Sequence, residues 1–153
     1  MKRFIVSAAL MLAVFFMASA QSNSKAEEIV GHYELTQGGD HSKVNITQNK
    51  NGSFKCQIEW VENDKDKNGK KRLDEKNPDK SLRTVPCDRI VLFDGLVYNA
   101  QKKQWDGTKI YDPQRGLRTN ITCSFTKEGK LEIKAKVLGI GETLYWTKLK
   151  EEK

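Results

Sequence analysis

The chain has 153 residues, with 27 lysines and arginines against 20 aspartates and glutamates, so its formal net charge at neutral pH is +7. This length suits one domain with a hydrophobic core of its own. Acidic residues interrupt the basic ones along the whole chain, and no basic stripe is interleaved with aromatic residues, which argues against a nucleic-acid-binding protein. Two histidines outside any ligand spacing and the lack of a Cys-x-x-Cys pair give no indication of a zinc site or a redox motif.

The first twenty residues have the pattern of a cleavable secretory signal. Lys2 and Arg3 precede an almost uncharged apolar run over residues 4–17, and the small residues 18–20 follow it. The run of about 14 residues is shorter than the roughly 20 needed to cross a bilayer. We therefore expect a signal peptide over residues 1–20, export to the periplasm or the exterior, and no membrane span after cleavage.

Alternation of apolar and polar side chains predicts strands along the rest of the chain. It is clearest over residues 53–61, 119–126 and 131–137, and weaker over 32–36, 43–47, 89–93, 96–98, 108–111 and 143–149. Asn51-Gly52, Asp94-Gly95 and Glu128-Gly129 are predicted turns between strands. Helical periodicity is nearly absent. The pattern therefore predicts an all-β fold, a small antiparallel up-and-down barrel of about eight strands in a single domain over residues 21–153.

Two cysteines fall on the apolar faces of predicted strands. Cys56 shares its face with Phe54, Ile58 and Trp60, and Cys123 lies on the apolar face of residues 119–126. Outside the cytoplasm such a pair could oxidise to a Cys56–Cys123 disulfide, leaving the third cysteine over. The alternative is that the cysteines are buried small hydrophobic residues.

Residues 62–87 interrupt the alternation with 14 charged side chains in 26 residues, and a connection of this length is uncommon unless it is functional or disordered. The segment contains the spacing of a calcium loop, D-x-D-x-N-G-x5-E. Its weak calcium-ligand candidates are Asp64, Asp66, Asn68 and Glu75. A predicted strand precedes the loop where a helix is usual, and residues 70–72 are all cationic, so a solvated Asp-Asn-Gly turn without a metal is the favoured interpretation.

Two clusters of turn-forming, charged and aromatic residues are candidates for ligand contacts. Their members are Asn77, Asp79, Arg83, Trp105, Tyr111 and Asp112. In one interpretation they are turns held by packing and charge, with Arg83 paired bidentately to a carboxylate. In the other, Trp105 and Tyr111 form a rim at the mouth of the barrel and Arg83 meets the polar head of a ligand. The residues alone favour the first interpretation.

Three motifs in order carry a resemblance to a known family. They are Asp74-x-x-Asn77-Pro78-Asp79-x-x-Leu82-Arg83, Trp105-x-Gly107-x-x-Ile110-Tyr111-Asp112-Pro113-x-x-Gly116, and Gly-x-Gly-x-Thr-x-x-Trp-Thr-Lys over residues 139–148. Together they resemble a bacterial envelope family, domain-of-unknown-function family 2147, over roughly residues 30–149. The resemblance implies a secreted or periplasmic, lipocalin-like β-barrel without an assigned activity. The chain departs from the family pattern at Glu142, where an arginine is usual.

No catalytic constellation is apparent in the sequence. There is no Gly-x-Ser-x-Gly motif, and no cysteine has a base close to it in the chain, so we expect neither an enzyme nor a cofactor. The barrel pattern, through analogy at the level of the fold, favours a protein that binds a small apolar or amphipathic ligand in the cell envelope. The alternative is a structural or protein-interaction module whose barrel is filled by its own side chains.

Overall fold

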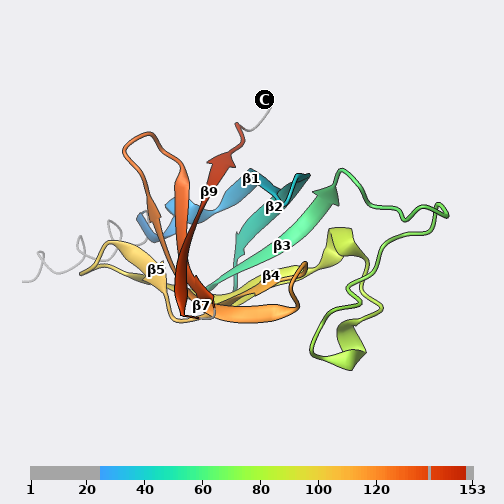
Figure 1. The fold of residues 1–153 in the computed structure, drawn as a ribbon. Helices are drawn as coiled ribbons and strands as arrows, with labels where there is room; N and C mark the ends of the chain where they lie inside the picture. The colour runs from blue at the N-terminus through green and yellow to red at the C-terminus, as the bar shows by residue number, and fades with distance from the viewer. Residues whose placement is uncertain (1–24, 138, 151–153) are drawn as a thin grey trace, which may run out of the picture.

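A computed structural model describes residues 25–137 and 139–150, and within them nine antiparallel strands form one sheet that closes into a barrel (Figure 1). The strands are β1 (Gly31–Gln37), β2 (Asp40–Gln48), β3 (Phe54–Val61), β4 (Val91–Asn99), β5 (Gln104–Asp106), β6 (Lys109–Asp112), β7 (Leu117–Phe125), β8 (Leu131–Val137) and β9 (Ile140–Lys148). Three 3-10 helices accompany them: η1 (Glu27–Ile29), η2 (Lys80–Leu82) and η3 (Cys87–Arg89). The predicted signal peptide lies outside the described residues. None of the helices that the structure describes has the length and apolar character of a membrane span.

The topology is up-and-down, as predicted. From β1 to β5 each strand pairs with its neighbour in the chain, the same holds from β6 to β9, and β1 closes against β9. The short strands β5 and β6 both pair with β7, through Trp105 opposite Cys123 and Lys109 opposite Asn120. They are thus two halves of one bent strand. The barrel has eight strand positions, which confirms the prediction of an all-β barrel of about eight strands.

Glycines in positive-φ conformations make two of the predicted turns, and the third prediction is wrong. Asn51-Gly52 and Glu128-Gly129 lie in the β2–β3 and β7–β8 turns. Asp94-Gly95 instead lies within β4, where the pairing register with β3 shifts and Gly95 has a φ of 85°. This is a β-bulge, for which glycine is well suited because it adopts positive φ without a steric penalty. The predicted strands 89–93 and 96–98 are therefore parts of one strand.

A second bulge changes the face on which Trp60 lies. Lys43 is paired with Trp60 and Val44 with Ile58, so Glu59 is an extra residue in β3. One extra residue moves every following side chain to the opposite face of a strand. Trp60 is consequently 43% exposed, with the ammonium of Lys43 5.5 Å from its ring centroid, whereas Val61 is buried. The prediction that Trp60 belongs to the core face is wrong.

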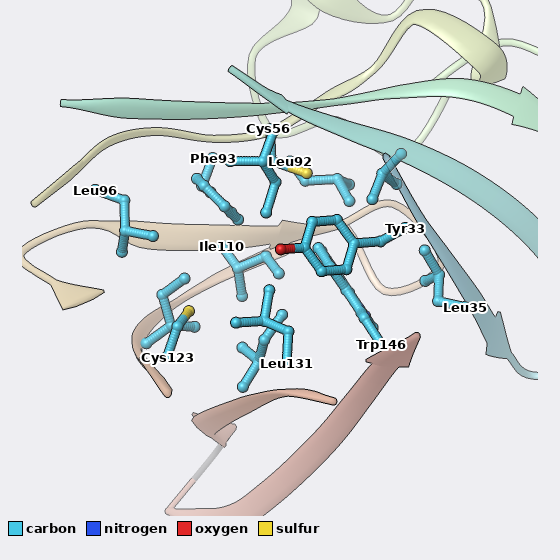
Figure 2. Close-up of a cluster of buried hydrophobic side chains, with 14 of the residues drawn as sticks. Tyr33, Leu35, Cys56, Leu92, Phe93, Leu96, Ile110, Cys123, Leu131 and Trp146 are labelled. Carbon is cyan, nitrogen blue, oxygen red and sulfur yellow. The ribbon is translucent and has the colours of Figure 1, made fainter. Parts of the chain in front are cut away.

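The interior of the barrel is filled with side chains from all around the sheet (Figure 2). The largest fully buried residues include Trp146, Tyr33, Phe54, Phe93, Leu131 and Ile133. The rings of Tyr33 and Trp146 lie 6.3 Å apart between centroids, and the Tyr33 hydroxyl donates a hydrogen bond to the carbonyl of Ile29. Such packing leaves the centre of the barrel to the protein itself.

The cysteines are free thiols in the structure, so the Cys56–Cys123 disulfide is not formed. Both side chains are buried on the inner face of the barrel, as their positions in the alternation predicted. Burial raises the pKa of the Cys123 thiol to about 12 and raises that of Cys56 well above its usual value. These two cysteines therefore act as small hydrophobic core residues.

The bent strand leaves one side of the barrel without a continuous hydrogen-bonded ladder. Residues 97–99 of β4 pair with β5, but after Gly107, which has a φ of 90°, the chain turns away from β4 and β6 pairs with β7. In the part of the chain that the structure describes, β4 and β6 have no ladder between them. The hydroxyl of Thr108 donates to the carbonyl of Asp94 at the point where β4 and β6 diverge. The long connection between β3 and β4 lies beside this gap.

A matched pair of isoleucines tests the placement of the core. Ile133 in β8 is fully buried, whereas Ile140 in β9 is 71% exposed. We expect Ile133→Ala to lower the free energy of unfolding by about 2–5 kcal/mol, because it leaves a cavity in a packed interior. Ile140→Ala should change it by less than about 0.5 kcal/mol. Urea unfolding followed by tryptophan fluorescence measures both, and similar losses for the two variants would contradict this description of the barrel.

Candidate functional site

The two predicted clusters meet at the carboxylate of Asp74. The hydroxyl of Tyr111 donates to Oδ1 and the side-chain amide of Asn77 donates to Oδ2, each at 2.6 Å. All three residues are buried, and Asp74 is only 4% exposed. Burial, reinforced by the hydrogen bond to Asp74, raises the pKa of Tyr111 above its usual value, so its hydroxyl keeps its proton and donates. Asp74 is thus the residue that joins the long loop to β6.

Asp74 was not among the candidates that the sequence indicated, although two of its partners were. Its signal was its place as the first residue of the Asp-x-x-Asn-Pro-Asp motif. A carboxylate in a run of charged loop residues is usually solvated, so the sequence offers no reason to expect this one to be buried. Only its distant partner, 37 positions along the chain, accounts for the burial.

The other candidates of the long loop stabilise the loop itself. Asp79 caps η2 by accepting hydrogen bonds from the amide and the hydroxyl of Ser81, which lower its pKa. The Nε of Arg83 donates to the carbonyl of Asn77 at 2.7 Å. The prediction that Arg83 forms a bidentate pair with a carboxylate is therefore wrong. The side chain of Arg83 instead closes the loop by bonding the backbone carbonyl of Asn77.

Trp105 and Tyr111 do not form an open rim, which corrects the predicted position of both side chains. Trp105 is buried beneath the N-terminal segment and donates from Nε1 to the carbonyl of Ala26 at 3.0 Å. Its ring packs edge-on against Phe125, with 5.7 Å between centroids. Tyr111 is covered by the long loop. Ligand contacts by the six candidate residues stay a prediction.

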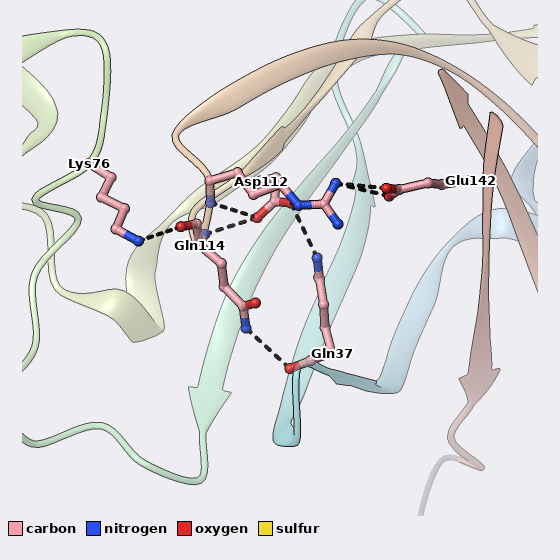
Figure 3. Close-up of polar contacts among 6 residues, drawn as sticks. Gln37, Lys76, Asp112, Gln114 and Glu142 are labelled. Carbon is pink, nitrogen blue, oxygen red and sulfur yellow. Dashed lines mark hydrogen bonds and ion pairs between the residues drawn. The ribbon is translucent and has the colours of Figure 1, made fainter. Parts of the chain in front are cut away.

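Asp112 organises the end of the barrel between the β1–β2 and β6–β7 turns (Figure 3). Its carboxylate accepts hydrogen bonds from the amides of Gln114 and Arg115, which closes the Asp-Pro turn. The side chain of Gln114 donates to the carbonyl of Gln37, and Lys76 of the long loop donates to the carbonyl of Gln114. Three segments far apart in sequence are thereby tied together at this end of the barrel, here called the mouth.

Glu142, the departure from the family pattern, has a local partner at this end of the barrel. The guanidinium of Arg115 contacts both of its carboxylate oxygens, at 2.8 and 3.1 Å (Figure 3). The pair raises the pKa of Arg115. Both side chains are substantially exposed, so the pair adds little to stability and serves mainly to position the turn against β9.

In the predicted calcium loop, the carboxylates of Asp64 and Asp66 accept hydrogen bonds from other groups of the same loop. Asp66 accepts from the amides of Asn68 and Lys70, which forms the Asp-Asn-Gly turn. Lys71 donates to Asp64 and to Asp88, both at 2.7 Å, and this contact lowers the pKa of Asp64. The fourth candidate, Glu75, lines a surface depression together with Asp66 and Lys71. Within residues 25–137 and 139–150 no cluster of three or more acidic, histidine or cysteine side chains is arranged to hold a metal ion.

The principal hollow of functional interest is a cleft of about 630 Å³ beside the gap between β4 and β6, here called the lateral cleft. Its walls come from the long loop, η3, β4, β6 and β7. The residues that line it are Asp74, Asn77, Leu82, Val85, Arg89, Ile90, Val91, Phe93, Asp94, Gly107, Thr108, Lys109, Arg118 and Asn120. Apart from Asn77, none of these was a sequence-level site candidate, because the cleft is assembled from five separate segments.

A second depression, of about 850 Å³, lies at the mouth and is bordered mainly by charged side chains of the long loop and of the β6–β7 turn. Beneath it is an apolar hollow of about 80 Å³ between Leu35, Ile58 and Leu92. This hollow has room for little more than a few heavy atoms. The lateral cleft is smaller than the depression at the mouth, but a larger share of its lining is apolar.

Tyr111→Phe tests the buried hydrogen bond to Asp74. The substitution keeps the ring and leaves one oxygen of a buried carboxylate without its donor, so we expect a loss of about 1–3 kcal/mol in the free energy of unfolding. Tyr145→Phe is the control, since Tyr145 is itself 52% exposed and its hydroxyl bonds Glu132 at 3.2 Å. Urea unfolding measures the stability, and hydrogen exchange over residues 74–85 measures the attachment of the loop. Equal effects of the two substitutions would contradict the role of Asp74.

Gly116→Ala tests the close approach of the long loop to the β6–β7 turn. A Cβ at Gly116 would lie 2.3 Å from the backbone oxygen of Lys76, whereas a Cβ at Gly129 would meet nothing within 4 Å. Both glycines have positive φ, 68° and 80°, so alanine costs about 1 kcal/mol of backbone strain at either position. We expect Gly116→Ala to lose at least a further 1 kcal/mol in urea unfolding because the loop must shift. A loss no greater than that of Gly129→Ala would rule out the contact.

Comparison with known proteins places this geometry in a family. The model of the family described as "Uncharacterized protein conserved in bacteria (DUF2147)" matches residues 31–148. Among solved structures, protein HP1028 from the human pathogen Helicobacter pylori, described as belonging to the lipocalin family, is similar with a TM-score of 0.63 and 23% sequence identity, over 80% of this chain and 84% of that chain. No curated protein matches. The chain therefore belongs to the bacterial family DUF2147, and its fold is that of a lipocalin-like β-barrel.

Proposed function

We propose that this protein is exported and binds a small apolar or amphipathic molecule without acting as an enzyme, and that the lateral cleft is its binding site. Three findings support the proposal: the lipocalin-like fold, membership of a family without an assigned activity, and a hollow of suitable size. Clefts of roughly 300–1,000 Å³ with a mainly apolar lining and a few placed polar groups are typical of small-molecule sites. Export is proposed from the sequence of residues 1–20.

The observation that carries the proposal is the apolar wall of the lateral cleft. Leu82 is 37% exposed, Val85 is partly buried against the core, and Phe93 lies at the base with its side chain in the barrel interior (Figure 2). The wall thus runs from a solvent-exposed leucine to the hydrophobic core. Covering such a surface with an apolar group is favourable by about 25 cal/mol for each Å² removed from water.

The filled interior decides where a ligand would bind. Tyr33, Phe54, Ile133 and Trp146 are all nearly fully buried in the core of the barrel. A molecule of ten or more heavy atoms would have to displace them, which would cost several kcal/mol in lost packing. The proposed site is therefore at the side of the barrel, next to the gap between β4 and β6.

The side chains with catalytic potential are engaged or unsuited to catalysis, which supports a binding role. Asp74 has a donor on each of its oxygens. His32 is exposed and bonds Glu59, and His41 contacts Thr36 at another position of the β1–β2 hairpin. Burial raises the pKa of all three cysteines, including the partly buried Cys87, which opposes formation of a nucleophilic thiolate.

The second candidate function is that of a structural or protein-interaction module. The filled interior favours it, since a barrel packed by its own side chains needs no ligand to be stable. The two functions differ in a measurable way: a binding protein takes up a small apolar probe at the lateral cleft, and an interaction module does not.

Two leucines of almost equal exposure allow a matched test with the neutral fluorescent probe N-phenyl-1-naphthylamine. Leu82 lines the lateral cleft and is 37% exposed, whereas Leu117 lies outside it and is 38% exposed. We expect Leu82→Ser to weaken probe binding roughly fivefold, because part of a leucine side chain leaves the apolar contact. Leu117→Ser should leave the affinity unchanged. Fluorescence titration of the purified protein gives both dissociation constants.

Native mass spectrometry of the protein purified from its own envelope completes the test. The proposal predicts an added mass that is lost on denaturation, on a polypeptide that begins after residue 20. A bare polypeptide that also fails to bind the probe would favour the interaction module. A chain that retains residues 1–20 would contradict export with cleavage.

A further inference from the structure

We infer that the lateral cleft is selective for an amphiphile with an anionic head group, and that Arg118 is the main contact for that head group. The inference rests on the proposed function, because it specifies the class of ligand for the same site. It is carried by the cationic side chains on one face of the β6–β7 hairpin and by the contact of Arg118 with the Tyr111 ring.

Arg118 is a cation in a fixed position. It is directly opposite Tyr111 in the pairing of β6 with β7, and its guanidinium carbon lies 4.8 Å from the centroid of the Tyr111 ring. A guanidinium over an aromatic ring is held by cation–π attraction and still presents N–H groups to a ligand. The ring is itself held by the hydrogen bond from its hydroxyl to Asp74. The buried network thus orients a charge at the surface of the cleft.

Lys109 extends the cationic face along the same hairpin. It precedes Tyr111 by two residues in β6 and is paired with Asn120, which follows Arg118 by two residues in β7. Residues two apart in a strand lie on the same face. Lys109, Arg118 and Asn120 all line the lateral cleft, and Arg89 of η3 adds a third cation to its lining. The hairpin and η3 therefore present basic and amide groups to one cleft.

These cations are available to a ligand, in contrast to the carboxylates nearby. Within the described residues, none of Arg89, Lys109 and Arg118 takes part in an ion pair. The two carboxylates of the cleft both accept hydrogen bonds: Asp74 from Tyr111 and Asn77, and Asp94 from the side chain of Asn49 at 2.8 Å.

Asp79, which does not line the lateral cleft, is a carboxylate whose pKa the charge of Arg118 affects. The charge of Arg118 contributes to the lowered pKa of Asp79, but the larger contributions come from the hydroxyl and amide of Ser81, to which Asp79 is bonded. Arg118 is therefore not neutralised by a direct carboxylate partner.

The two sides of the cleft together define the ligand. Leu82 and Val85 offer an apolar surface, and Arg118 with Lys109 offers a cationic one. A molecule with a hydrocarbon part and a carboxylate, sulfate or phosphate group matches both surfaces at once. A neutral apolar molecule would use only the first, and a cationic amphiphile would be repelled by the second.

Isothermal titration with three ten-carbon amphiphiles, below their critical micelle concentrations, tests the inference on the purified protein. The probes are decanoate, n-decyl maltoside and decyltrimethylammonium, which differ in head-group charge. We expect decanoate to bind about tenfold more tightly than the neutral probe, in line with a charge-assisted hydrogen bond. Arg118→Gln should remove that advantage and leave the affinity for decyl maltoside unchanged. Lys102→Gln, a change of an exposed lysine outside the cleft, should alter neither affinity.

The outcomes separate this inference from the proposed function. Equal binding of the three probes, or tightest binding of the cationic one, would overturn anion selectivity and leave a binding protein. No binding of any probe would overturn both. Sedimentation with phosphatidylglycerol vesicles in the absence of decanoate binding would assign the cationic face to a membrane surface and overturn the inference. Loss of the decanoate advantage in Arg118→Gln, with unchanged decyl maltoside binding and an unchanged unfolding curve, would support it.

Discussion

The attachment of the long loop to the barrel depends on one buried carboxylate. Asp74 accepts a hydrogen bond from Asn77 in its own loop and another from Tyr111 in β6, and it is almost inaccessible to water. A buried carboxylate is tolerable only when its oxygens have donors, so this arrangement requires the loop and the strand to stay together. The cover over Tyr111 and one wall of the lateral cleft follow from that requirement.

The local irregularities of the barrel determine where its surfaces face. A bulge in β3 turns Trp60 outward and Val61 inward, and the bend at Gly107 separates β6 from β4. A regular barrel of eight strands would have a continuous ladder between β4 and β6. It would leave no room for a lateral cleft. Bulges are over-represented next to functional sites in β-sheets, and the proposed site lies where the ladder is interrupted.

The filled interior distinguishes the architecture of this protein from a barrel with a central cavity. Eight strands enclose a space that side chains can fill, and aromatic residues such as Tyr33, Phe54 and Trp146 occupy much of it here. The lipocalin-like fold therefore does not by itself locate a site. At the lateral cleft, an apolar wall and a row of cations lie beside each other, and that juxtaposition supports the proposed binding function.

Alternation of side chains along the chain was sufficient to establish the all-β class, most of the strands and the inward position of Cys56 and Cys123, since the two faces of a strand are encoded by a local period of two. It could not reveal the bulges at Glu59 and Gly95, because an extra residue is visible only in the register with the neighbouring strand. The motifs around Asn77 and Tyr111 marked the right segments, but the burial of Asp74 between them depends on a contact across 37 positions. The lateral cleft could not be read from the sequence for the same physical reason: its walls come from five segments that only the closed barrel and its attached loop bring together.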